Sequence, residues 1–91
     1  MTEVNLYDES KCAGLKSFYQ TLFPNYQVPD NEQWRRWMSL HSGEVLSYAI
    51  RQAAKKRDYI ESTGDVMSYV HVLRFISSVA NRRSEEIAML V

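Results

Sequence analysis

The sequence has little of the material that disulfides, tight turns or a membrane span would require. It contains one cysteine, two prolines and three glycines in 91 residues. A single cysteine, Cys12, forms no disulfide within the chain and is typical of a reducing compartment. So few turn-forming residues argue against a many-stranded β-sandwich. Charged residues interrupt every long apolar segment, so we expect no membrane span.

A targeting signal and a second domain are also not evident. The opening residues MTEVNLYDES lack the basic and apolar regions of a secretion signal, which together with Cys12 predicts a cytoplasmic location. A hydrophobic content of 45% and a charged content of 24% are ordinary for a globular protein. The length and the lack of internal repeats or linkers predict a single helical domain over residues 1–91.

Residues that carry catalytic or metal chemistry are sparse. The three glycines are too far apart for a phosphate-binding loop, and neither His41 nor His71 has a cysteine or carboxylate at ligand spacing. Cys12 falls on an apolar stripe, which favours a buried thiol over a nucleophile. Ser42 stands beside His41 and Glu44, but residues this close on a helix start do not converge on one substrate atom. We therefore expect a non-enzymatic protein with no cofactor and no metal.

Three helices are predicted in the first two thirds of the chain. The first follows Asp8 or Ser10 as cap, and its apolar face comprises Cys12, Leu15, Tyr19, Leu22 and Phe23. Asp30 and Gln33 form a capping box for a short second helix that ends near His41, with Trp34, Trp37 and Met38 inside. Ser42 caps the third, whose inner stripe is Leu46, Ala49, Ile50 and Ala53. Opposite that stripe lie Arg51 and Lys55.

A fourth helix is predicted after Asp65, which we expect to be its cap. This helix carries two apolar stripes. One comprises Val66, Tyr69, Val70, Leu73, Ile76 and Ala80, and the other comprises Val72, Phe75 and Val79. Ser84, with Glu85 and Glu86, is expected to start a short C-terminal helix with an apolar end at Ile87–Val91. The predicted fold class is all-α, a compact bundle of four main helices plus a short C-terminal helix.

Charge is distributed unevenly along a chain that is neutral overall. Residues 35–57 contain six basic residues and one acidic residue, a net charge of +5, whereas the flanking segments 1–34 and 58–65 each carry −3. A neutral chain polarised in this way can present a basic face to a phosphate backbone. The competing interpretation is that residues 35–57 are simply the solvated side of two helices.

The order of features in three segments of the sequence is similar to that of a known protein family. LKSFYQTLFPNYQVPD places Tyr19 on a helix that precedes a loop and a capped helix, and NEQWRRWMSLHSGEVLSYAIRQAAKKRD leads into a capped helix with the pattern EVL..AI..A. SYVHVLRFISSVANR places a tyrosine before a run of apolar residues. In this order, over about residues 15–83, they resemble the DnaD-like replication domain of Gram-positive primosome proteins and phage replication proteins. The last-helix motif of that family, Tyr-x-x-x-Ile-x-x-x-Trp, corresponds here to Tyr69, Leu73 and Ser77, so its tryptophan is replaced.

The resemblance implies a DNA-replication accessory module, typical of a phage or mobile element, that binds single- or double-stranded DNA weakly, a replication protein, or both. The predicted DNA-binding residues are Arg51, Lys55, Lys56, Arg57, Tyr69, Arg74, Arg82 and Arg83.

The alternative is a protein–protein adaptor or inhibitor that recognises a host or phage protein through an apolar helical surface. The predicted interface comprises Val72, Phe75, Val79, Ile87 and Leu90. A homo-oligomer is compatible with both functions. A third interpretation is a structural fragment of a larger assembly.

Overall fold

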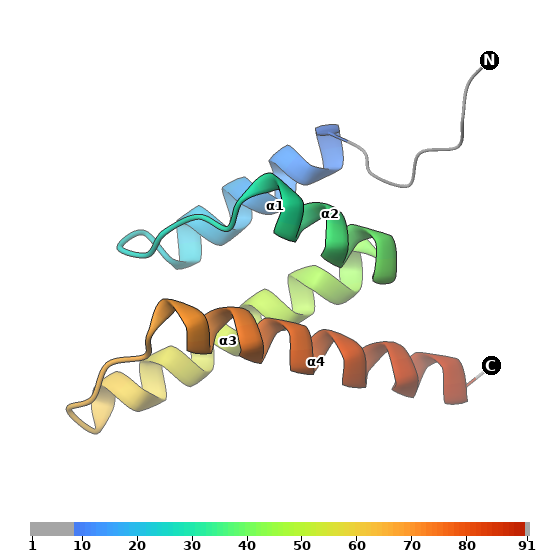
Figure 1. The fold of residues 1–91 in the computed structure, drawn as a ribbon. Helices are drawn as coiled ribbons and strands as arrows, with labels where there is room; N and C mark the ends of the chain where they lie inside the picture. Colours follow the sequence, from blue (N-terminus) through green and yellow to red (C-terminus); the bar gives the residue numbers. More distant parts are fainter. Residues whose placement is uncertain (1–8, 91) are drawn as a thin grey trace, which may run out of the picture.

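Four α-helices make up the regular secondary structure of the part of the chain that the structure describes (Figure 1). The computed structural model describes residues 9–90, with the side chains of residues 10–90. The helices are α1 (Glu9–Leu22), α2 (Asn31–Leu40), α3 (Gly43–Ser62) and α4 (Tyr69–Met89). The predicted all-α bundle with four main helices is therefore confirmed.

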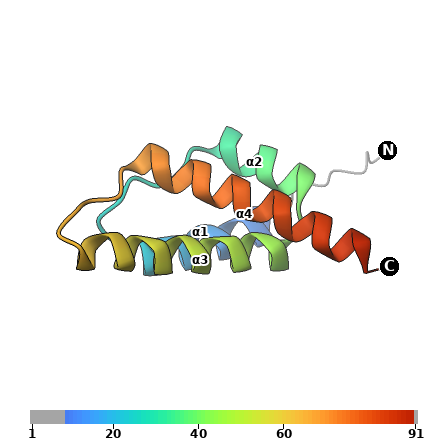
Figure 2. The same cartoon turned by 90° about the horizontal axis from the view of Figure 1, so that it is seen from below.

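The helices form two layers. Figure 2 shows α1 and α3 side by side in one layer, with α2 and α4 in the other. The most extensive helix–helix contact is between α3 and α4. In both views the last turns of α4 extend past the beginning of α3, so this end of α4 is only partly covered (Figures 1 and 2).

Two of the predicted caps start their helices as expected. A side-chain oxygen of Asp30 accepts a hydrogen bond from the backbone N–H of Gln33 at 2.9 Å, and Ser42 accepts one from Val45 at 3.2 Å. The first helix begins at Glu9, so Ser10 lies inside it. The other cap considered, Asp8, lies outside the described residues.

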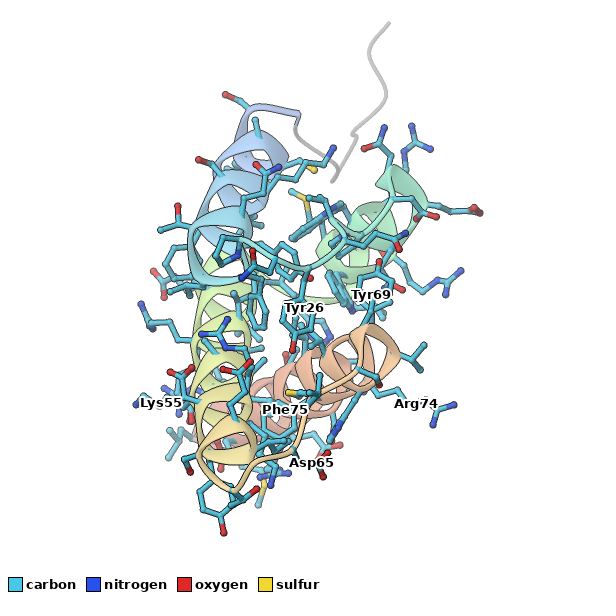
Figure 3. The ribbon with its side chains drawn as sticks, turned by 90° about the vertical axis from the view of Figure 1, so that its left-hand side faces the viewer. Tyr26, Lys55, Asp65, Tyr69, Arg74 and Phe75 are labelled. Carbon is cyan, nitrogen blue, oxygen red and sulfur yellow. The ribbon has the colours of Figure 1, made fainter. Side chains whose placement is uncertain are left out.

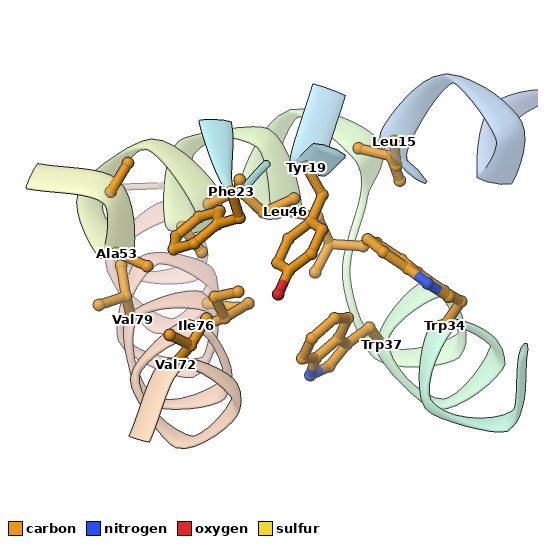
Figure 4. Close-up of a cluster of buried hydrophobic side chains, with 14 of the residues drawn as sticks. Leu15, Tyr19, Phe23, Trp34, Trp37, Leu46, Ala53, Val72, Ile76 and Val79 are labelled. Atoms are coloured by element: carbon orange, nitrogen blue, oxygen red, sulfur yellow. The ribbon is translucent and has the colours of Figure 1, made fainter. Parts of the chain in front are cut away.

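Five aromatic rings form a continuous chain, and Figure 4 labels four of them, Phe23, Tyr19, Trp34 and Trp37. Tyr19 stacks on Phe23 with ring centroids 4.8 Å apart, and Phe23 meets Tyr26 edge-on at 5.4 Å. In the other direction, Tyr19 meets Trp34 at 6.1 Å and Trp34 meets Trp37 at 5.2 Å, both edge-on. Rings in these arrangements attract one another beyond the gain from burying their area. The chain joins α1, the α1–α2 loop and α2.

The polar atoms of these aromatic residues hold the α1–α2 loop in place. The hydroxyl of Tyr19 donates to the carbonyl of Gln27 at 2.9 Å, and the indole N–H of Trp34 donates to the carbonyl of Pro29 at 2.9 Å. Both side chains have no exposed surface. A buried donor without a partner is costly, and among residues 10–90 no buried side-chain nitrogen or oxygen lacks one.

The polar atoms of Tyr26 and Trp37 connect the α1–α2 loop and α2 to α4 and to the connection that precedes α4. The hydroxyl of Tyr26 donates to the carbonyl of Met67, in the α3–α4 connection, at 2.6 Å. The indole N–H of Trp37 donates to the hydroxyl of Ser77 at 2.8 Å. Ser77, a half-buried residue of α4, thus serves as the hydrogen-bond acceptor of a tryptophan from α2.

The beginning of α4 differs from the prediction. Asp65 is not its cap, because that carboxylate accepts from the N–H of the next residue, Val66, at 2.8 Å. The cap is Ser68, whose hydroxyl accepts from the N–H of His71 at 3.1 Å. Val66 therefore precedes the helix, and 77% of its surface is exposed.

The inward face of α4 also differs from the prediction. Its buried residues are Val72, Ile76, Val79 and Ala80. Val70, a member of the first predicted stripe, is 55% exposed. The spacing i, i+4, i+7, i+8 of the buried set is a single helical face, and that face packs on α3 in Figure 4.

No separate C-terminal helix follows Ser84. The helix α4 runs to Met89 without interruption, since no glycine or proline occurs within it. The hydroxyl of Ser84 forms a hydrogen bond with His41 and is not a cap. The expected short helix is thus the final part of α4.

We predict that Ser77→Ala lowers the free energy of unfolding by about 1–2 kcal/mol, because it leaves the indole N–H of Trp37 without its acceptor. The matched control is Ser78→Ala, which removes an exposed hydroxyl from the next position of the same helix. This control should change stability by less than about 0.5 kcal/mol. Urea unfolding of the three proteins measures both values, and equal effects of the two substitutions would contradict the role assigned to Ser77.

Candidate nucleic-acid interface

The outer face of α3 displays two of the predicted cations. Arg51 and Lys55 are both exposed and lie about one turn apart. Among the described residues, neither belongs to an ion pair. Tyr48 and Tyr59 lie on the same side of the helix, and 64% of the surface of Tyr59 is exposed. We refer to Tyr48, Arg51, Lys55 and Tyr59 as the α3 outer stripe.

Arg57 does not belong to this face, although it follows directly in sequence. Its side chain is only 15% exposed and donates to the carbonyl of Leu22, at the end of α1. The guanidinium lies over the ring of Phe23, 4.8 Å from the centroid, and pairs with Asp58 at 3.0 Å. With its donors engaged in this way, Arg57 joins α3 to α1 and is not available to a phosphate. The structure therefore places Arg57, one of the predicted DNA-binding residues, at the junction of α3 and α1 and not on the exposed face of α3.

Lys56 occupies an intermediate position. Its side chain is half-buried, and Nζ lies 5.6 Å from the centroid of the Tyr59 ring. A lysine over a tyrosine face is held by the ring's negative potential while its charge remains in water. Lys56 therefore adds positive charge at the edge of the α3 outer stripe.

Arg74 and Tyr69 lie away from that stripe. In Figure 3, Lys55 is on one side of the α3–α4 pair and Arg74 is on the opposite side. Tyr69 is half-buried near Tyr26, at the start of α4. Burial, and to a lesser extent the carboxylate of Asp30, raises the pKa of Tyr69. The eight predicted DNA-binding residues thus do not form one surface.

Of the two neighbouring arginines near the end of α4, one points to solvent and the other toward α3. Arg82 is exposed. The guanidinium of Arg83 lies over the ring of Tyr48, 5.0 Å from the centroid, and pairs with Glu86 at 3.6 Å. Arg83 is therefore brought close to the α3 outer stripe, although it comes from a distant part of the sequence.

A groove opens at the same end of the bundle, where the first half of α1, the first turns of α3 and the last turns of α4 meet. Its volume is about 730 Å³. The large apolar residues that line it are Leu15, Phe18, Val45, Tyr48 and Ile87. The charged residues that line it are Lys11, Arg51 and Arg83, with Glu44 as the carboxylate. We refer to it as the basic groove.

Sequence patterns did not reveal this groove. Phe18 lies beside the apolar face of the first helix, and Tyr48 lies near Arg51 and Lys55, but periodicity does not show which other helix faces them. Lys11 is on α1, outside the basic segment 35–57. The groove arises because α4 reaches past the start of α3, and the length of α4 was not predicted.

The predicted partner interface is only partly on the surface. Val72 has no exposed surface and Val79 is 8% exposed, so both belong to the core and not to a docking face. Phe75 is half-buried against the core. Ile87 and Leu90 are 42% and 85% exposed, and these two remain accessible.

Comparison with protein-family models, with curated proteins and with solved structures found no match for this chain. Within residues 9–90, histidine, cysteine and carboxylate side chains form no group of three or more that could hold a metal ion. No helix in this range is both long and apolar enough to cross a bilayer.

His41 connects the end of α2 to the part of α4 that borders the groove. Its Nδ1 and the hydroxyl of Ser84 are joined by a hydrogen bond of 2.8 Å. Burial lowers the pKa of His41 below its ordinary value of 6.5, and a hydrogen bond with Asn81 opposes this shift. The folded state therefore favours the neutral imidazole.

We predict that His41 makes stability fall with acidification. Its contribution is fully present above pH 6.5 and is lost as the pH falls from 6.5 through its lowered folded-state pKa, because the unfolded chain binds the proton more readily. The measurement is the free energy of unfolding of wild type and of His41→Gln at about pH 7.5 and pH 5. Taking the difference between the two proteins cancels the effects of the carboxylates that both contain. The stability difference between the two proteins should shrink at the lower pH, and a constant or growing difference would be the contrary result.

Proposed function

We propose that this protein is a non-enzymatic accessory module of DNA replication, of phage or mobile-element type, that binds single-stranded DNA weakly through the α3 outer stripe. The observation that carries the proposal is the placement of two exposed cations between two tyrosines on one face of α3. Cations that follow a phosphate backbone and aromatic rings that stack on bases are the usual parts of a single-strand binding surface. The order of helices and the segment patterns, which resemble the DnaD-like domain, support the replication context.

The charges around the stripe favour an anionic ligand. The carboxylate of Asp58, one turn beyond Lys55, is already paired with Arg57. Lys56 adds a further positive charge beside Tyr59. Arg51 and Lys55 are exposed, so each can contact a phosphate without a rearrangement of the core. Two such contacts imply weak binding that depends on salt.

We predict that a labelled oligonucleotide of about 20 nucleotides binds at low salt, and that affinity falls about five- to tenfold between about 50 and 200 mM salt. Lys55→Glu should weaken binding about fivefold or more, since it replaces an attraction by a repulsion. The matched control is Arg74→Glu, the same type of charge reversal on the opposite side of the α3–α4 pair. Its effect should be less than about twofold.

Fluorescence anisotropy measures these affinities, and a duplex of the same length tests the preferred form of DNA. A lack of binding at low salt, binding that does not respond to salt, or equal effects of the two charge reversals would each refute the proposal.

A second candidate function is a protein–protein adaptor. The observation that favours it is the apolar end of α4, where Ile87, Met89 and Leu90 are 42%, 84% and 85% exposed. Apolar side chains gathered at one end of a helix are typical of contact surfaces.

A further inference from the structure

The basic groove has the dimensions and the lining of a binding site. Its volume of about 730 Å³ is within the usual range for sites that hold a ligand or an anchoring side chain. Three helices from distant parts of the sequence form its walls, so the groove exists only in the folded bundle. Four of the α3 and α4 side chains considered above, Val45, Tyr48, Arg83 and Ile87, converge on it.

The floor of the groove is apolar and incompletely covered. Leu15 and Val45 pack into the core at 6% and 5% exposure, and Phe18 and Tyr48 are half-buried beside them. Ile87 continues the inward face of α4 that begins with Ile76 and Ala80, but it lies where α4 extends past α3 and 42% of its surface is exposed. Water contact with this apolar surface is unfavourable, and an apolar side chain of a partner would remove it.

The edge of the groove is predominantly positive. Among the lining residues that the structure describes, Lys11, Arg51 and Arg83 are basic and Glu44 is acidic. Arg83 is positioned by its contact with the Tyr48 ring, which leaves the edge of the guanidinium able to receive a carboxylate. Its pairing with Glu86 spans 3.6 Å between two side chains that are 42% and 55% exposed, so a partner's carboxylate can replace it at little cost.

We propose that the basic groove binds a polypeptide segment of a partner protein that carries large apolar side chains flanked by carboxylates. The apolar floor would receive the anchors, and Arg51 and Arg83 would receive the carboxylates, which is how charge and shape jointly specify a groove ligand. The aliphatic side chains Leu15, Val45 and Ile87 favour an apolar side chain over a nucleobase. This proposal rests on the second candidate function and supplies its site and its ligand chemistry. Tyr48 and Arg51 belong to both the groove and the α3 outer stripe, whereas Lys55 and Tyr59 do not line the groove, so substitutions at unshared residues distinguish the two sites.

The test is an anisotropy titration with two fluorescein-labelled helical peptides of about twelve residues. The probe carries leucine and phenylalanine on one face and glutamate on the other, and the control peptide has lysine in place of every glutamate. The wild-type protein should bind the glutamate peptide at least about tenfold more tightly than the lysine peptide. Absence of saturable binding of the glutamate peptide at low salt, or equal binding of both peptides, would overturn the proposal.

Two substitutions at adjacent positions of α4 localise the binding. Arg83→Glu reverses a charge that lines the groove and should lower the affinity for the glutamate peptide about fivefold or more. Arg82→Glu makes the same change at an exposed residue that does not line the groove, and its effect should be less than about twofold. Ile87→Ser removes an apolar contact of the groove at a residue that is already exposed, so the fold should be retained. This substitution should also lower the affinity for the glutamate peptide. Equal losses with the two arginine variants would refute the assignment.

The same variants separate this proposal from DNA binding. Lys55→Glu should reduce oligonucleotide binding and leave the glutamate peptide unaffected, because Lys55 does not line the groove. Arg83→Glu should weaken binding of the glutamate peptide and leave oligonucleotide binding unaffected. If the oligonucleotide displaces the peptide, and Arg83→Glu weakens the oligonucleotide more than Lys55→Glu does, the groove is a nucleic-acid site and the peptide proposal fails.

Discussion

The chain of aromatic rings through Phe23, Tyr19, Trp34 and Trp37 is the contact on which the rest of the structure depends. It fixes α1 against α2, and Tyr26 extends it to the loop between them. The polar atoms of the two tyrosines and two tryptophans donate to three loop carbonyls and to a serine of α4. Large rings thus bury apolar area while their donors hold loops that have few other constraints. A small domain can hold its connections in this way without a disulfide.

The position of α3 within this frame determines both candidate surfaces. Its inner face, which includes Leu46, Ala49, Ile50 and Ala53, is completely buried, so the opposite side must face solvent. That side is the α3 outer stripe. The small alanines let α4 approach closely. Because α4 continues past the first turn of α3, its last turns extend beyond the end of the bundle. The stripe and the basic groove are therefore two consequences of one packing arrangement.

Local signals in the sequence predicted much of this fold and little of the site. The caps at Asp30 and Ser42 and the inner faces of the first three helices follow from short-range chemistry, and the structure confirms them. Helix α4 is apolar around most of its circumference, so periodicity alone did not identify its inward face, and Val72 and Val79 were assigned to a partner when they belong to the core. Arg57 was grouped with the exposed cations for a related reason. A charge run in sequence does not reveal which cation meets a loop carbonyl from another helix.

The α3 outer stripe and the basic groove share Tyr48 and Arg51, and we propose that they bind different ligands through the residues that they do not share. Amide chemical shifts, recorded while the oligonucleotide and the glutamate peptide are titrated in turn, test it most directly. We expect the oligonucleotide to shift amides along the middle and end of α3, around Lys55 and Tyr59, and the peptide to shift amides around Phe18, Val45 and Ile87. A single set of shifts common to both ligands, or shifts centred on Arg74, would contradict this assignment.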